Sequence, residues 1–204
     1  SVFWALYWRR EIFFAPVETR FDAASILDFM DSNNIDFLTC VPSYMTTIQT
    51  LTESKPLLSV KCVISTGEPL HSINIRAIQR LFPSADLLNL YGSTEVCGDV
   101  TWHKVNGEYD CQTVTDAPIG TPIIPRSVFI IDEEGAVIEK SNVHGEIAVS
   151  GPLLSMGYFG DEDLNAASFC EVHVGSINER VKIFRTGDYG MRDSSGTFHC
   201  FGRK

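Results

Sequence analysis

An amide, an aromatic ring, two hydroxyls and a carboxylate follow one another in the short stretch 89–95, Asn89-Leu90-Tyr91-Gly92-Ser93-Thr94-Glu95. The glycine allows backbone to approach a ligand closely, the hydroxyls can donate hydrogen bonds, and the carboxylate can hold a metal ion. Because the apolar run 85–90 leads into this stretch, the cluster lies at the carboxyl end of a predicted strand, where open α/β sheets bind ligands. The same residues also suit an ordinary turn from strand to loop, and the stretch alone does not separate the two interpretations.

The elements that position this stretch are apolar strand segments that alternate with helical patterns along the sequence. Buried strands are predicted over 12–15, 36–41, 61–64 and 87–90, and helices over 2–8, 44–51 and 73–82. Asp22 can cap a further helix, which carries Ile26, Leu27 and Met30. The helix over 2–8 is apolar at nearly every position, so we expect it to be buried. Strands and helices that alternate through short links indicate an α/β subdomain with a parallel sheet.

The helical spacing fades after about residue 118, and strand patterns take its place. Strands are predicted over 127–132, 145–151, 181–184 and 197–201, with turns over 133–135 and 193–196. This half is interpreted as an antiparallel sheet or a small distorted barrel. We place the boundary near residues 112–118, which divides the chain into an α/β subdomain, 1–116, and a β-barrel-like subdomain, 117–204.

Composition narrows the classes of protein that this chain can belong to. Its 204 residues are 44% hydrophobic and 21% charged, so a packed globular core is expected. A formal net charge of −10 argues against a non-specific nucleic-acid binder, which needs a basic footprint. A nucleotide ligand remains compatible with this charge, because backbone N–H groups, hydroxyls and Mg²⁺ can hold phosphates in an acidic protein.

The cysteines and the N-terminal segment bear on location. None of the six cysteines forms a C-x-x-C pair, so we interpret them as free buried thiols in a reducing compartment and expect a cytoplasmic protein. Arg9, Arg10 and Glu11 interrupt the apolar residues near the N-terminus, well short of the roughly 18 uninterrupted residues that a membrane helix needs. No membrane span is therefore predicted.

Four segments together resemble one known family, the adenylate-forming (AMP-binding) enzymes. They are 65–70, then 89–95, then 145–151 with Gly157 and Tyr158, and last 185–188 with 202–204. Each motif is weak alone, whereas all four in this order and spacing are specific. The family includes acyl-CoA synthetases, luciferases and the adenylation domains of nonribosomal peptide synthetases. The resemblance implies an ATP-dependent ligase that activates a carboxylate as an acyl-adenylate, releases pyrophosphate and transfers the acyl group to the thiol of CoA or phosphopantetheine.

The resemblance also assigns roles to residues. Tyr91 is expected to stack on adenine, and the side-chain oxygen of Asn89 to accept from the adenine amino group. Thr94 would donate to the α-phosphate, Glu95 would help to hold Mg²⁺, and Asp188 would accept from the ribose hydroxyls. The expected ATP and AMP site comprises Gly67, Glu68, Pro69, Asn89, Leu90, Tyr91, Gly92, Ser93, Thr94, Asp188 and Arg203, with Thr94 and Glu95 as its catalytic residues.

Ordinary structural roles compete with several of these assignments. Tyr91 also suits core packing, and Asp188 after a glycine also suits a turn. Glu68 and Glu95 also suit acids at the starts of helices, where the helix dipole favours them. Trp102 is expected in the core, and the neighbouring His103 and Lys104 on the surface.

The acyl pocket is carried over from the peptide-synthetase branch of the family. It comprises Phe3, Ser43, Ile64, Thr66, Leu90, Gly98 and Asp99. A carboxylate at Asp99 could pair with the ammonium of an amino acid, which favours an amino acid over a fatty or aryl acid as the substrate. The alternative is that Asp99 is a solvated loop acid.

Two parts of the family pattern are missing from this sequence. We expect the lysine-containing phosphate loop before residue 1, and a small domain with a catalytic lysine after residue 204. Weak nucleotide binding and no turnover are therefore expected from these residues alone, with a carrier protein as a further partner of the whole enzyme. A non-catalytic module that binds a nucleotide or a partner, and a purely structural α/β domain, are the competing interpretations.

Overall fold

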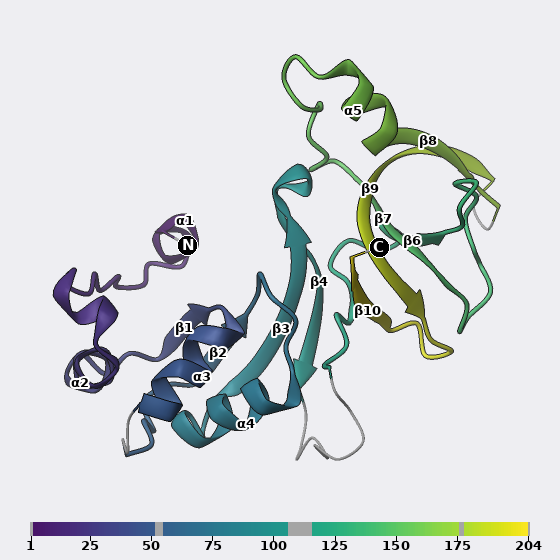
Figure 1. Cartoon of the computed structure of the whole chain (residues 1–204). Helices are drawn as coiled ribbons and strands as arrows, with labels where there is room; N and C mark the ends of the chain where they lie inside the picture. The colour runs from purple at the N-terminus through teal and green to yellow at the C-terminus, as the bar shows by residue number, and fades with distance from the viewer. Residues whose placement is uncertain (1, 52–54, 106–115, 176–177, 204) are drawn as a thin grey trace.

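The computed structural model describes residues 2–51, 55–105, 116–175 and 178–203 of the chain. Its strands form two sheets that lie side by side, one covered by helices and one curled into a partial barrel (Figure 1). No helix in the described ranges has the length and apolar character needed to cross a membrane.

The first sheet has the strand order β1-β2-β3-β4-β5. Its strands are β1 Phe37–Cys40, β2 Cys62–Ser65, β3 Asp86–Ser93, β4 Gly98–Val105 and β5 Thr121–Pro122. The first three are parallel, as expected for the α/β pattern, whereas β4 runs antiparallel to β3 and β5 antiparallel to β4. Because β5 lies beyond residue 116, the first sheet continues past the predicted boundary.

Helices α2 Ala23–Ser32, α3 Pro42–Leu51 and α4 Ser72–Leu81 accompany the parallel strands. Asp22 caps α2 as predicted, since its side chain accepts from the backbone N–H of Ser25. In α4, Ile75, Ile78 and Leu81 recur at helical spacing and are buried. They pack in one core with residues of α2, α3 and the parallel strands, which fixes the sheet and so the ends of its strands.

The second sheet has the order β10-β9-β7-β6, with β8 paired to β9. Its elements are β6 Val128–Ile131, β7 His144–Ser150, helix α5 Glu162–Ser168, β8 Phe169–Val174, β9 Glu179–Arg192 and β10 Phe198–Arg203. Figure 1 shows β9 as one long curved strand, which pairs with β7, β8 and β10 along its length. The antiparallel second half that the sequence predicts is therefore confirmed.

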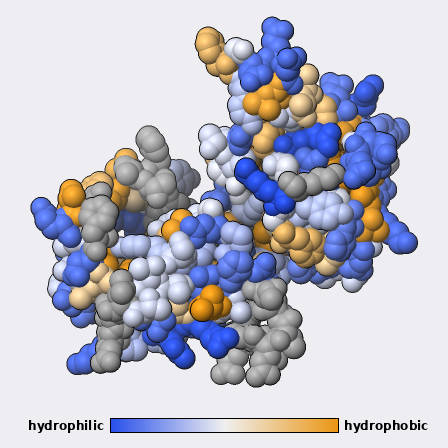
Figure 2. All heavy atoms as spheres, viewed as in Figure 1, coloured by the Kyte–Doolittle hydropathy of each residue, from blue (hydrophilic) through white to orange (hydrophobic). Residues whose placement is uncertain are grey.

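The two sheets meet at Gly120 and Phe198. Each donates its backbone N–H to the carbonyl of the other, with N···O distances of 3.1 and 2.7 Å. Val96 and Val100, which follow β3, pack with barrel residues in one hydrophobic cluster. The end of the β3–β4 hairpin is thus held against the barrel, and Figure 2 shows the two halves as two lobes joined across a narrower waist.

Several sequence predictions are wrong at the level of elements. Residues 12–15 form no strand and are exposed at Ile12, Phe13 and Phe14, the last to 72%. The first helix exists as α1 Val2–Tyr7, but Leu6 and Tyr7 are exposed rather than buried. An apolar segment is buried only if another part of the protein packs over it. The composition of the segment does not show whether such a partner exists. Three further elements, β4, α5 and β8, were not predicted from the sequence.

Three side chains differ from their predicted surroundings. Trp102 is 45% exposed and so does not belong to the core. His103 is half-buried rather than on the surface, and burial lowers the pKa of its imidazole, with His199 as a second cause. Cys97 is exposed, whereas Cys40, Cys62, Cys170 and Cys200 are half-buried free thiols; Cys111 lies outside the described residues.

Candidate active site

A cleft of about 370 Å³ opens between the end of β3 and the barrel strand β9. Of the predicted residues, Gly92, Ser93, Glu95, Asp188 and Arg203 line it. Two segments that lie far apart in the sequence therefore come together at one cleft, one from each sheet. Glu146, Tyr158, Arg185 and Thr186 also line the cleft, although the sequence analysis gave none of them a role.

A hydrogen bond joins the two predicted segments directly. The hydroxyl of Tyr91 donates to Oδ2 of Asp188 at 2.6 Å, across 97 residues of sequence. Burial raises the pKa of the Tyr91 hydroxyl, and the hydrogen bond to Asp188 raises it further, so the hydroxyl stays protonated as the donor. The ring is partly buried against the barrel cluster, so the packing role considered for Tyr91 is also present.

Asp188 has a second partner on the open side of the cleft. Nε of Arg203 lies 3.4 Å from its Oδ1, and the Arg203 side chain is 83% exposed. An exposed ion pair of this kind contributes little energy, so Arg203 can move without great cost. An ionised carboxylate has about four lone-pair positions, and Asp188 therefore keeps acceptor capacity beside Tyr91 and Arg203.

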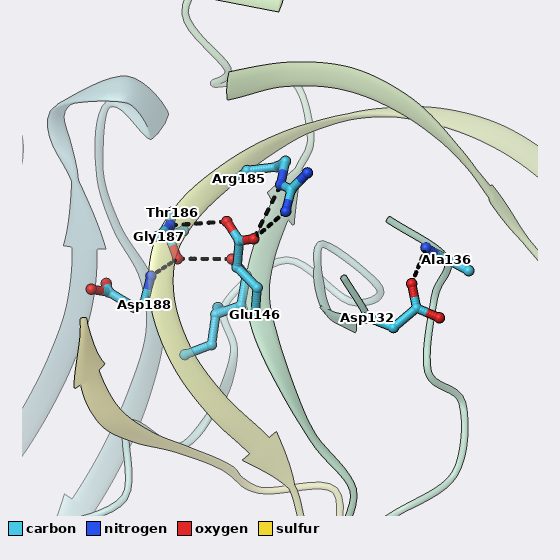
Figure 3. Close-up of polar contacts among 8 residues, drawn as sticks. Asp132, Ala136, Glu146, Arg185, Thr186, Gly187 and Asp188 are labelled. Atoms are coloured by element: carbon cyan, nitrogen blue, oxygen red, sulfur yellow. Dashed lines mark hydrogen bonds and ion pairs between the residues drawn. The ribbon is translucent and has the colours of Figure 1, made fainter. Parts of the chain in front are cut away.

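The backbone around Asp188 is fixed by Glu146 on β7. Oε2 of Glu146 accepts from Nη2 and Nε of Arg185 at 2.6 and 3.1 Å, and its Oε1 accepts from the N–H of Gly187 at 3.1 Å. The hydrogen bonds that Arg185 donates to Glu146 are the main reason that the pKa of its guanidinium is raised. Figure 3 shows the Glu146 carboxylate between Arg185 and Gly187, with the Asp188 side chain pointing away from it.

A bulge in β9 turns Asp188 toward the first sheet. The register between β7 and β9 shifts between Glu146 and Ala148, and Gly187 takes a φ of +74°, which favours glycine. Thr186 secures the bulge, because its hydroxyl donates to the carbonyl of Ile147 at 2.8 Å and accepts from the N–H of Asp188 at 3.0 Å. The side chain of Asp188 is thus oriented by its own strand before any ligand arrives.

Glu95 lies on the other wall of the cleft, in the short 3-10 helix Thr94–Val96. Burial would raise the pKa of its carboxyl, but hydrogen bonds, first that from Tyr158, outweigh burial and lower the pKa overall. The Tyr158 hydroxyl donates to Oε1 at 2.8 Å. Thr94 is exposed at the start of the same helix and does not line the cleft.

The donor set around Glu95 fits a hard cation that a nucleotide brings with it. The described residues hold no group of three or more His, Cys, Asp or Glu side chains that could bind a metal ion by themselves. Mg²⁺ is commonly held by one or two carboxylates together with the phosphates of a substrate and several waters. One carboxylate at the edge of an open cleft matches that chemistry.

The residues predicted beside adenine do not line this cleft. Gly67, Glu68 and Pro69 form an exposed loop after β2. Both oxygens of Glu68 accept from Ser43, one from its backbone N–H at 3.0 Å and one from its hydroxyl at 2.9 Å. Glu68 therefore does act as an acid at a helix start, although the helix is α3. Asn89 is 3% exposed, and its amide group donates to the carbonyl of Pro118 at 2.8 Å.

The predicted acyl-pocket residues are brought together in part. The hydroxyl of Thr66 donates to Oδ1 of Asp99 at 2.7 Å. Ile64 and Leu90 alternate with the helix-packed residues Val63 and Leu87, so they lie on the opposite face of the sheet. Ser43 is exposed beside Glu68, and Gly98 is exposed with a φ of +120°. The side chain of Phe3 lies outside the described residues.

The missed residues carried only weak signals in the sequence. Glu146 and Arg185 are opposite charges inside otherwise apolar strand patterns, where a charge needs a partner. Tyr158 follows a glycine in one of the segments that carried the family resemblance. None of these features names the partner residue, because the pairing depends on which strands become neighbours.

A comparison with models of protein families shows to which family the chain belongs. Residues 1–159 match the model of the family described as AMP-binding enzyme. The chain belongs to this family. The resemblance stated from the sequence is thereby confirmed, and so is the predicted fold class, a parallel-sheet α/β part followed by a small antiparallel barrel-like part.

Individual members of the AMP-binding family match nearly the whole chain. Zwittermicin A synthase ZmaJ of Bacillus cereus is 31% identical over 211 residues, which cover 98% of this chain and 38% of that protein. Bacitracin synthase 1 of Bacillus licheniformis is 28% identical over 205 residues, which cover 100% of this chain and 4% of that protein. The structure of holo-PA1221, a protein with adenylation and PCP domains, is 27% identical with a TM-score of 0.77, and the match covers 90% of this chain and 31% of that one. The chain thus spans well under half of each of these relatives.

Proposed function

We propose that this chain holds the nucleotide in an ATP-dependent ligase that activates a carboxylate as an acyl-adenylate and releases pyrophosphate. The hydrogen bond between Tyr91 and Asp188 carries the proposal. It joins Tyr91, the residue expected at the base, to Asp188, the residue expected at the ribose, and Asp188 lines the same cleft as Glu95. Family membership and the similarity to Bacitracin synthase 1 and Zwittermicin A synthase ZmaJ support the same activity.

Four side chains at or near the cleft have roles in this proposal that their chemistry suits. Asp188 accepts from the two ribose hydroxyls, and the Tyr91 hydroxyl keeps its carboxylate in place. Glu95 offers an oxygen ligand to Mg²⁺. The bound ion would neutralise phosphate charge while the carboxylate of the acyl substrate attacks the α-phosphate. Thr94 donates to the α-phosphate, where charge develops in the displacement. Thr94 and Glu95 are the proposed catalytic residues, because they touch the reacting phosphates or their cation.

The adenine side and the acyl side of the site complete the proposal. Adenine lies against Tyr91, with the loop 67–69 along the base and Asn89 as the partner of its amino group. The acyl group lies along the face of the sheet that bears Ile64 and Leu90. Asp99, which Thr66 already holds, pairs with the ammonium of an amino acid. The exposure of Asp99 equally suits a solvated acid, so a fatty or aryl acid is the alternative substrate.

The acceptor and the organisation of the whole protein belong to the same proposal. A phosphopantetheine thiol on a carrier protein is the preferred acceptor, because the related PA1221 contains a PCP domain, and CoA is the alternative. We propose the division into residues 1–116 and 117–204, with β5 as an extension of the first sheet. A cytoplasmic location fits the five described cysteines, all of which are free thiols.

Calorimetric titration tests the nucleotide site directly. AMP, and ATP with MgCl₂, are titrated into the 204-residue chain, and saturable binding of both is expected. An exchange assay between labelled pyrophosphate and ATP on a longer protein that contains this chain then tests the substrate. Exchange driven by amino acids is the expected result, whereas exchange driven only by fatty acids would refute the amino-acid substrate. Absence of any nucleotide binding by the chain would refute the proposed site.

A further inference from the structure

Tyr158 contacts Glu95, and the roles that the family resemblance assigns do not include this contact. It lies 63 residues further along the chain, and its hydroxyl donates to Oε1 of Glu95 at 2.8 Å. The same segment also contacts the backbone of Glu95, because the N–H of Ser155 donates to the Glu95 carbonyl at 2.8 Å. Residues 155–158 therefore hold both the main chain and the side chain of Glu95.

Asn165 in α5 fixes the backbone of Tyr158. Its Oδ1 accepts from the N–H of Tyr158 at 2.6 Å, and its Nδ2 donates to the carbonyl of Tyr158 at 2.8 Å. A carboxamide satisfies a donor and an acceptor on one residue at the same time, which neither a carboxylate nor an apolar side chain can do. Asp161 caps α5 by accepting from Leu164, so Asn165 stands on an ordered turn of helix.

Two further features keep this arrangement in place. A Cβ at Gly157 would lie 2.5 Å from Oδ1 of Asn165, so only glycine allows the segment to approach the amide this closely. The ring of Tyr158 packs edge-on against Phe169, with centroids 5.8 Å apart, and Phe169 in turn packs against Phe184 of the barrel. The direction of the Tyr158 hydroxyl is thus set from both ends of the side chain.

We propose that Tyr158 and Asn165 are positioning residues that hold the Glu95 carboxylate in the orientation that binds the divalent cation of the nucleotide. Tyr158 uses one of about four lone-pair positions of the carboxylate, so this hydrogen bond orients the carboxylate without filling it. A fixed carboxylate loses less freedom when the cation binds than a mobile one, and binding is tighter for that reason. This inference rests on the proposed nucleotide site. It adds two side chains that affect the binding of the metal ion and not the binding of the adenosine.

The test compares the gain in ATP affinity that Mg²⁺ provides in the wild-type chain and in Tyr158→Phe. ATP is titrated by calorimetry in MgCl₂ and in EDTA, and AMP is titrated in EDTA. The phenylalanine keeps the ring packing and removes only the hydroxyl, so we expect the Mg²⁺-dependent gain to shrink by about three- to tenfold. AMP affinity in EDTA is expected to be unchanged, which a general structural defect would not allow.

Asn165→Ala tests the second step, and we expect the same selective loss of the Mg²⁺-dependent gain. Tyr189→Phe is the matched control, because Tyr189 packs against His144 outside the cleft and its variant should behave as wild type. Melting temperatures report the folding of each variant; should Asn165→Ala unfold, Tyr158→Phe alone decides. A full Mg²⁺ gain in Tyr158→Phe, or an equal loss of AMP affinity in EDTA, would overturn the inference while the nucleotide site stands. Failure of the wild-type chain to bind any nucleotide would remove the proposed function and the inference with it.

Discussion

At the scale of single residues, Asp188 is the group on which the proposed nucleotide site depends. Its side chain meets Tyr91 from the first sheet and Arg203 from β10. Both partners are suited to a carboxylate and poorly suited to an amide, because a phenolic donor and a guanidinium need acceptors. Replacement of the Asp188 carboxylate by an amide therefore removes the charge and should weaken ligand binding, while the shape of the side chain stays the same.

Asp188→Asn should weaken AMP binding by about tenfold, since the amide keeps the volume but loses one acceptor oxygen and the charge. Calorimetric titration of AMP measures the dissociation constant. Asp28→Asn, a change of the same type at an exposed position of α2, is the matched control and should bind as wild type. Equal affinity in Asp188→Asn and wild type would show that Asp188 does not contact the ribose.

At the scale of elements, the bulge of β9 and its support on β7 give Asp188 its direction. Glu146 uses both of its oxygens, one for Arg185 and one for the backbone of Gly187. Glutamine at position 146 would offer only one oxygen, and its amide group would face the guanidinium or the backbone N–H as a second donor.

Glu146→Gln should loosen residues 185–188 and lower the free energy of unfolding by about 1–3 kcal/mol. Hydrogen exchange at the Gly187 and Asp188 amides should become faster, and AMP affinity should fall with it. Native-state exchange followed by NMR measures the first effect, and calorimetry the second. Unchanged exchange at Gly187 would contradict the supporting role of Glu146.

The hairpin between β9 and β10 supplies a prediction on pH. Burial would raise the pKa of Asp193, but hydrogen bonds from Ser195, His199 and Thr197 outweigh it and hold the pKa far below its usual range. A depressed pKa in the folded state stabilises the protein above the unfolded value of about 3.9. That stability is lost as the pH falls through the folded pKa.

Asp193→Asn should therefore be less stable than wild type at pH 7, and the difference should shrink as the pH is lowered below about 4. Urea unfolding at pH 7, 5 and 3 measures the free energy of unfolding of both proteins. A difference that is the same at all three values would show that the charge of Asp193 has no part in the stability of the hairpin.

The elements differ in how far the sequence could predict them. In α2 and α4 the signal is local, since a cap and a helical period are both written in consecutive residues. In β4 the local signal is absent, because Gly98, Asp99 and His103 break the apolar alternation that indicates a strand. The motifs pointed to Glu95 and Asp188, which line the cleft, whereas the contacts of Glu146, Tyr158 and Asn165 became visible only from the pairing of distant segments. Contacts between such segments follow from topology, which local spacing does not specify.

At the scale of the molecule, the cleft exists because the two sheets are held together, and the backbone pairing of Gly120 with Phe198 is one of the contacts between them. The carbonyl of Trp102 would lie 1.9 Å from a Cβ at Gly120, so the close approach of β4 to this residue requires glycine. Gly120 also has a φ of +91° and exchanges hydrogen bonds with Phe198 of the barrel. Its replacement should disturb the junction and, through it, the cleft.

Gly120→Ala should lower the free energy of unfolding by about 2–4 kcal/mol, because both overpacking and backbone strain oppose the side chain. Gly196→Ala is the matched control, since Gly196 has a similar φ of +88° but open space around it. The control should lose only about 1 kcal/mol. Urea unfolding of both variants gives the comparison, and equal losses would contradict a close approach at Gly120.

The central claim is that adenine nucleotides bind between the end of β3 and the bulge of β9. An NMR titration of the ¹⁵N-labelled chain with AMP tests it most directly, because it reports each backbone amide and tolerates weak binding. We predict saturable shift changes at Gly92, Gly187 and Asp188. No change is expected around the second cleft, of about 300 Å³, which Val137 and Phe198 help to line in the barrel. Shift changes confined to that second cleft, or none at millimolar AMP, would contradict the account.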